Sequence, residues 1–248
     1  MNMNNDLYKE KSKIYYWLLF TGILAMLVFS VVAGILFGSA DLSFSTVWQV
    51  VKLKLLGIEN QDLSFSTISI VWELRLPRVL LAIAAGGGLA VSGAAMQAVT
   101  QNVLAEPYIL GASSGASAFV AFSYVMGSAF FISSFGVSLF AFTGAMVSLL
   151  VVYSIGMVGS SGSGNQLVLA GMAVSVILNA VTQFFISISP SALNVRSIVS
   201  WMMGSLSSAR WHNLAVPFFG AVLGSQFFIF AARAYNIISL GDDTAVSL

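Results

Sequence analysis

Long apolar stretches alternate with short polar segments along the chain. Stretches without Asp, Glu, Lys or Arg cover residues 14–40, 79–105, 107–195 and 211–232. A membrane-spanning helix needs about 20 mostly apolar residues, so each stretch can hold at least one. Small polar residues, which favour turns, divide the longest stretch at 127–128 and at 159–165. The pattern therefore predicts six spanning helices, at residues 14–37, 79–98, 110–126, 131–158, 166–188 and 213–233.

Two polar segments, residues 38–78 and 189–212, carry too much charge to cross a bilayer and are predicted as loops. They hold four of the five tryptophans, a residue that favours the membrane–water interface. Four predicted spans separate the segments, so both are expected on one side of the membrane. Lys9, Lys11 and Lys13 precede the first span and favour a cytoplasmic N-terminus. The basic residues of the two segments favour the opposite orientation, so charge alone leaves it open.

Composition excludes several classes of function. Only 8% of the residues are charged, against about 25% in a soluble domain, so a soluble enzyme is excluded. The net charge of +1 gives no electrostatic footprint for nucleic acid. The chain has no cysteine and one histidine, so we expect no metal site, and no serine has a base beside it. The fold class is an all-α polytopic membrane protein, with residues 1–248 forming one transmembrane domain that needs no cofactor.

Small and amide residues within the spans have two interpretations each. Gly111 and Gly115 lie four apart and favour close helix packing within one bundle over a dedicated dimer motif. Gln97, Asn179 and Gln183 could line a polar passage or bond between helices, and the two readings are equally supported. The third span, short and rich in Gly and Ser, suits a helix buried among others. The repeat of LSFST at residues 42–46 and 63–67 is interpreted as chance.

The sharpest local feature is Arg75-Leu76-Pro77-Arg78, directly before the second span. Proline suits the first turn of a helix, so the two arginines could anchor that helix among lipid headgroups. Alternatively they form a basic patch that binds carboxylates of a partner, because arginine pairs with carboxylates through two hydrogen bonds. The residues by themselves favour the anchor.

Several motifs in order resemble the FecCD-type permeases of ABC importers, which take up iron-siderophores, haem and vitamin B12. These motifs are RLPRVL at residues 75–80, SGAAMQA at 92–98, NVLAEPYILG at 102–111, LAGMA at 169–173, WMMGS at 201–205 and LGDDTA at 240–245. One departure is Val103, where the family commonly has proline. Family members have about ten spans, and the chain is expected to represent the first six, ending at Leu248 before the segment that contacts the ATPase.

The resemblance implies roles for particular residues. It implies a cytoplasmic N-terminus in the cell membrane, an extracytoplasmic segment 38–78, and docking of a substrate-binding protein by Arg75 and Arg78, which now outweighs the anchor reading. A cytoplasmic gate is implied at Asn102, Glu106, Pro107, Ser160 and Ser161. The translocation path is implied near Gln97, Asn179 and Gln183. The implied partners are a second permease subunit, two ATPase subunits, the binding protein and membrane lipid.

The function expected from this resemblance is that of a permease subunit for an iron-siderophore or related chelate such as haem or a corrinoid. The chain is not itself an enzyme, since it lacks a GxxxxGK[ST] phosphate-binding loop. One alternative is a truncated permease fragment that does not transport. A stand-alone secondary transporter or channel is disfavoured, because such carriers usually need a charged residue inside the membrane and the interiors of the predicted spans have none. The motifs do not distinguish the chelates, nor a homodimer from a heterodimer.

Overall fold

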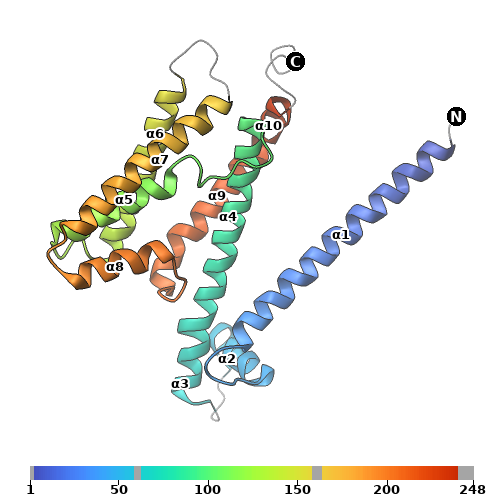
Figure 1. The fold of residues 1–248 in the computed structure, drawn as a ribbon. Helices are drawn as coiled ribbons and strands as arrows, with labels where there is room; N and C mark the ends of the chain where they lie inside the picture. Colours follow the sequence, from blue (N-terminus) through green and yellow to red (C-terminus); the bar gives the residue numbers. More distant parts are fainter. Residues whose placement is uncertain (1–2, 59–62, 158–163, 240–248) are drawn as a thin grey trace. The chain divides into compact units, whose positions relative to one another are not determined.

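The computed structural model describes residues 3–58, 63–157 and 164–239, and in these ranges all regular secondary structure is helical (Figure 1). The chain divides into two compact units. Unit 1 comprises residues 1–83 and 206–218, and unit 2 comprises residues 84–205 and 219–248. In chain order the helices are α1 Met3–Leu36, α2 Phe44–Leu56, α3 Phe65–Ile68, the π-helix η1 Ser69–Arg75, α4 Leu76–Thr100, α5 Ala112–Met126, α6 Ser134–Gly156, α7 Gly164–Ser187, α8 Ala192–Met203, α9 Trp211–Phe230 and α10 Ala232–Ile238.

Each of the six predicted spans coincides with a helix. Five helical stretches are long and apolar enough to cross a membrane: Lys13–Leu36, Phe65–Thr100, Ser134–Gly156, Gly164–Ser187 and Trp211–Phe230. The sixth, α5, is apolar but has only 15 residues. The chain is therefore an all-α polytopic membrane protein, as predicted.

The two segments predicted as loops are largely helical. The first contains α2, α3 and η1, and the second contains α8. The LSFST repeat supplies the reason for two of these helices. Ser43 and Ser64 are N-caps, and the Oγ of each accepts a 3.2 Å hydrogen bond from the backbone N–H three residues later. The repeat is thus a capping motif used twice, rather than a chance similarity.

The second span begins earlier than the predicted residue 79, because α3, η1 and α4 form one continuous helix from Phe65 to Thr100. The helix continues through Pro77 because a wider turn precedes it. Leu76 donates its backbone N–H to Val71 O, five residues back. Proline lacks a backbone N–H, and a π-turn is one of the local adjustments that accompany such an interruption.

Unit 1 has its core where the end of α1 meets α2 and η1. Ile35, Val47, Val50 and Val71 are buried there, and Trp72 packs against them. This small core fixes η1, which ends with Arg75, and the first turn of α4, which carries Arg78.

Unit 2 is organised around α5, which lies beside α6 and α7 (Figure 1). A Cβ added to Gly115 would meet the carbonyl of Gly144 on α6, and a Cβ on Gly144 would meet the carbonyl of Gly115. The backbones can approach this closely only because both residues are glycine. The predicted packing role of Gly115 is confirmed, and α5 is buried among its neighbours as expected.

Candidate functional site

Arg75 is buried, with 7% of its surface exposed. Its Nη1 donates to Ile35 O at 2.8 Å and to Leu36 O at 2.6 Å, and its Nη2 donates to Ala40 O at 2.6 Å. The last carbonyls of a helix have no partner within the helix, and one guanidinium satisfies them here at the end of α1. Arg75 therefore orders the turn between α1 and α2.

Gly38 makes this arrangement possible. A Cβ at Gly38 would lie 2.7 Å from Nη2 of Arg75, closer than a methyl group can approach. The sequence motif alone does not reveal this requirement, because Gly38 and Arg75 are far apart along the chain.

Arg78 differs from Arg75 in its surroundings. It is exposed, and its Nη2 donates one long hydrogen bond of 3.4 Å to Ser207 O. Close by, Trp211 Nε1 donates to Trp72 O at 2.8 Å, and the two indole rings lie 5.1 Å apart. Within unit 1 the ends of the two polar segments therefore lie together.

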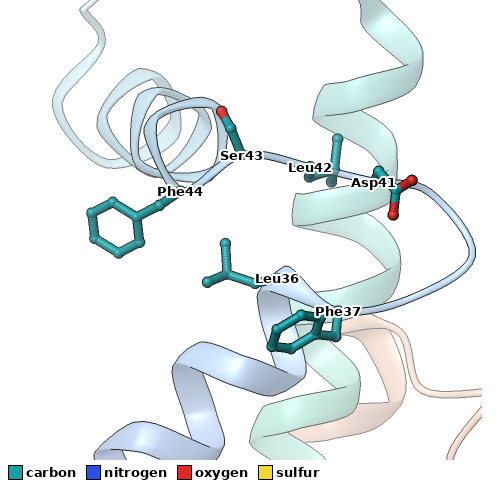
Figure 2. A pocket seen from close by; sticks show the side chains of 6 residues that line it. All are labelled: Leu36, Phe37, Asp41, Leu42, Ser43 and Phe44. Atoms are coloured by element: carbon teal, nitrogen blue, oxygen red, sulfur yellow. The ribbon is translucent and has the colours of Figure 1, made fainter.

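A shallow pocket of about 420 Å³ opens where the chain turns from α1 into α2. Figure 2 shows its lining side chains: Leu36, Phe37, Asp41, Leu42, Ser43 and Phe44. Asp41 is its one ionisable group, so the pocket lacks the several convergent polar groups typical of a small-molecule site. Among the described residues there is also no group of three or more His, Asp or Glu side chains placed to hold a metal.

The predicted gate residue Asn102 organises the connection between α4 and α5. Its Oδ1 accepts a 2.9 Å bond from the N–H of Leu104, and its backbone N–H donates to Gln97 O at 3.2 Å. Gln97 in turn donates from Nε2 to Val103 O at 3.0 Å. Gln97, assigned to the path from the resemblance, is thus brought together with the gate residue Asn102. It stabilises this turn through its own hydrogen bonds.

The other predicted gate residues are distributed around this turn. Glu106 is exposed, Pro107 is half-buried, and the backbone of Glu106 accepts a 3.0 Å bond from Ile109 N–H. Ser160 and Ser161 lie outside the described residues. The helix that follows them begins at Gly164, where an added Cβ would lie 2.7 Å from Thr100 Cα. The start of α7 therefore packs on the end of α4, next to the Asn102 turn.

Asn179 and Gln183 lie on an exposed face of α7. Met172 and Val176 continue that face, while Gly171, Val174 and Thr182 are buried on the other side of the helix. Within the described residues these two amides make no hydrogen bond to another helix, and Gln97 does not join them. The face combines apolar side chains with two amides that nothing in the described chain covers.

Comparison with known proteins places this geometry in a wider context. Residues 26–248 match the model of the FecCD transport family. The chain is 35% identical over 179 residues to the cobalamin import system permease protein BtuC of Halobacterium salinarum, covering 72% of this chain and 47% of that protein. It is 33% identical over 233 residues to the ferric enterobactin transport system permease protein FepD of Escherichia coli, covering 92% of this chain and 65% of that protein.

A solved structure is also similar. It is the inward-facing conformation of a metal-chelate type ABC transporter, with a TM-score of 0.74 and 25% identity. The match covers 92% of this chain and 67% of that one. The chain thus spans roughly half to two thirds of the length of the curated relatives named above.

Proposed function

Because the chain belongs to the FecCD transport family, we propose that it acts as a permease subunit of an ABC importer. Its substrate is an iron-siderophore or a related metal chelate such as haem or a corrinoid. The observation that carries this proposal is the family match over residues 26–248, together with relatives named for cobalamin and ferric enterobactin transport. The predominance of apolar helices supports a place in the cell membrane. For the proposed orientation, with the N-terminus in the cytoplasm, the support is the three lysines before the first span, Lys9, Lys11 and Lys13.

The partners follow from what the sequence lacks and from the family. No phosphate-binding loop of the GxxxxGK[ST] form is present, so ATP is hydrolysed by two partner subunits. A second permease subunit completes the pathway, and a binding protein delivers the chelate outside the cell. ATP binding and hydrolysis shift the permease between outward-open and inward-open states. A ligand raises the population of whichever state it binds more tightly.

The two arginines divide the docking function between them. Arg78 is exposed and offers its guanidinium to acidic residues of the binding protein. Arg75 is buried and orders the turn after α1, so it supports the docking surface by holding η1 and α1 together. The long bond from Arg78 to Ser207 O leaves most of its five N–H donors for a partner.

The exposed face of α7 is the part of the chain best suited to the translocation path. Burying an amide in hydrocarbon without a hydrogen bond is costly, so Asn179 and Gln183 are better placed against water or a partner helix than against lipid. Apart from Arg233 at the end of the last one, the predicted spans contain no Asp, Glu, Lys or Arg, and the path therefore recognises its chelate by shape and weak polar contacts. Around the Asn102 turn, the gate closes the cytoplasmic end.

Affinity purification of the tagged chain from its native membrane tests the proposal. We expect an ATP-hydrolysing subunit and a second permease chain to copurify, and the complex to hydrolyse ATP. Purification of the chain without any ATPase, under detergent conditions that preserve a known importer of this family, would show that it does not act as such a subunit.

A further inference from the structure

In unit 1, Arg210 lies beside Arg78, although it is not part of the RLPR motif at residues 75–78. Arg210 Nη1 donates to Ser207 O at 3.1 Å, and Arg78 Nη2 donates to the same oxygen at 3.4 Å. Ser207, which lies three residues before Arg210, is 129 residues from Arg78, so the two arginines are far apart in sequence. Two guanidinium groups therefore converge on one backbone carbonyl.

The loop that carries Arg210 is held by its own hydrogen bonds. Asn213 accepts from the backbone N–H of Arg210 at 2.8 Å, and its Nδ2 donates to Ser208 O at 2.9 Å. Ala209 is buried, and Trp211 is hydrogen-bonded to Trp72 O. These contacts position Arg210 in advance, so little side-chain and loop freedom remains to be lost when a ligand binds.

The charge of this pair is not compensated within the described chain. Neither Arg78 nor Arg210 forms an ion pair with any described carboxylate, and the exposed Glu73 nearby in sequence forms none either. Arg210 uses its Nη1 on two carbonyls, which leaves its Nε and Nη2 without a described partner. Two like charges held close together repel, and an anion placed between them removes that repulsion.

We propose that Arg78 and Arg210 together form one carboxylate-binding site that receives an Asp or Glu side chain of a docking protein, with Asn213 as the residue that positions Arg210. Each guanidinium presents a planar fork of N–H donors that matches a carboxylate. The choice of a protein carboxylate rests on the proposed function, in which a binding protein docks on this side of the membrane. An anionic phospholipid headgroup is the competing ligand.

The test uses the full chain in nanodiscs of phosphatidylcholine and a fluorescent hexaglutamate peptide as the probe. Binding is measured by thermophoresis at low salt. Arg210→Gln and Arg78→Gln are each expected to weaken binding about tenfold or more, the change expected when a hydrogen bond to a charged group is lost. The double variant is expected to lose less than the product of the single effects, because both arginines hold the same carboxylate.

Matched variants separate the site from general electrostatics and from misfolding. Arg196→Gln removes an exposed arginine of α8 in unit 2 and is expected to leave the affinity unchanged. Arg210→Lys keeps the charge but not the fork, so it is expected to retain part of the binding. Tryptophan emission, to which Trp211 contributes, checks that the loop is intact, and a hexaglutamine peptide gives the background.

Three outcomes would overturn the inference. The first is an unchanged affinity in Arg210→Gln, and the second is independent, fully multiplicative effects of the two arginines. The third is loss of phosphatidylglycerol binding in Arg210→Gln, seen by native mass spectrometry of the chain reconstituted with that lipid, with unchanged peptide binding in the phosphatidylcholine nanodiscs. The titration requires neither ATP nor transport. A chain that passes it without copurifying an ATPase would refute only the proposed function.

Discussion

Arg75→Ala should loosen the end of α1 without changing the exposed charge of the docking surface. The substitution removes three hydrogen bonds, from Nη1 to Ile35 O and Leu36 O and from Nη2 to Ala40 O. Hydrogen bonds involving a charged group contribute about 1.5–3 kcal/mol each. Since two of these three bonds are only partly buried, water can replace part of the loss. We therefore expect about 3–5 kcal/mol of local destabilisation.

Hydrogen exchange of the segment between α1 and α2 measures this effect. Every 1.4 kcal/mol changes an equilibrium constant tenfold, so exchange from the locally opened state should accelerate by roughly 100-fold or more. The amide of Phe37, which donates to Ala33 O at 2.8 Å, is the most informative reporter. Arg78→Ala is the matched control, because its guanidinium makes one long bond elsewhere, and exchange at Phe37 should not change.

Arg75→Lys separates the contribution of the positive charge from that of the hydrogen bonds. An ammonium keeps the positive charge but cannot span the three carbonyls as a planar fork does. If the hydrogen bonds matter, this variant exchanges almost as fast as Arg75→Ala. Slow exchange in both Arg75 variants, or equal acceleration in Arg78→Ala, would refute the assignment of Arg75 to the end of α1.

Three further predictions concern unit 2. Gly115→Ala should lower the thermal midpoint in detergent, with about 1–3 kcal/mol of overpacking cost against the Gly144 carbonyl. The control is Gly86→Ala, where an added Cβ meets nothing within 4 Å, and it should be neutral or stabilising. Equal thermal midpoints for Gly115→Ala and Gly86→Ala would contradict the close packing of α5 on α6. Asn102→Ala should lower the stability of the α4–α5 connection by about 1 kcal/mol, the usual contribution of a neutral hydrogen bond. It should also speed hydrogen exchange at the amide of Leu104, which donates to Asn102 Oδ1. Unchanged exchange would show that its Oδ1 is dispensable. Asn179→Leu should reduce chelate uptake at normal membrane abundance, whereas unchanged uptake would place this residue away from the path.

The positions of the six spanning helices could be predicted from the sequence because apolar length alone determines them, whereas the shorter helices α2, α3, η1 and α8 of the polar segments could not. The end of α6, expected at residue 158, is Gly156, and α4 extends a helix that starts at Phe65. That extension could not be read from hydropathy, since polar and charged residues follow Phe65. The capping signal was nevertheless present, because Ser64 and Thr67 have the spacing that Ser43 and Thr46 repeat.

The two arginines of the RLPR motif show where sequence reasoning stops. They lie three residues apart on one helix, and nothing in the motif says which one is buried. Burial of Arg75 depends on the free carbonyls at the end of α1 and on the absence of a side chain at Gly38. Arg210 could not be found in the same way, because its place beside Arg78 depends on a contact between segments that are distant in sequence. Long-range pairing of this kind leaves no local pattern.

Uptake of radiolabelled chelates in the native host tests the central claim most directly. The chromosomal copy of the gene is deleted, and the strain is complemented with the wild-type chain or with Arg78→Glu. A panel of ferric hydroxamate, ferric catecholate, ferric citrate, haem and cobalamin covers the proposed substrate class. We predict that deletion abolishes energy-dependent uptake of at least one chelate, that the wild-type chain restores it, and that Arg78→Glu at equal abundance does not. Undiminished uptake of every chelate in the deletion strain would contradict the assignment of this chain to chelate import.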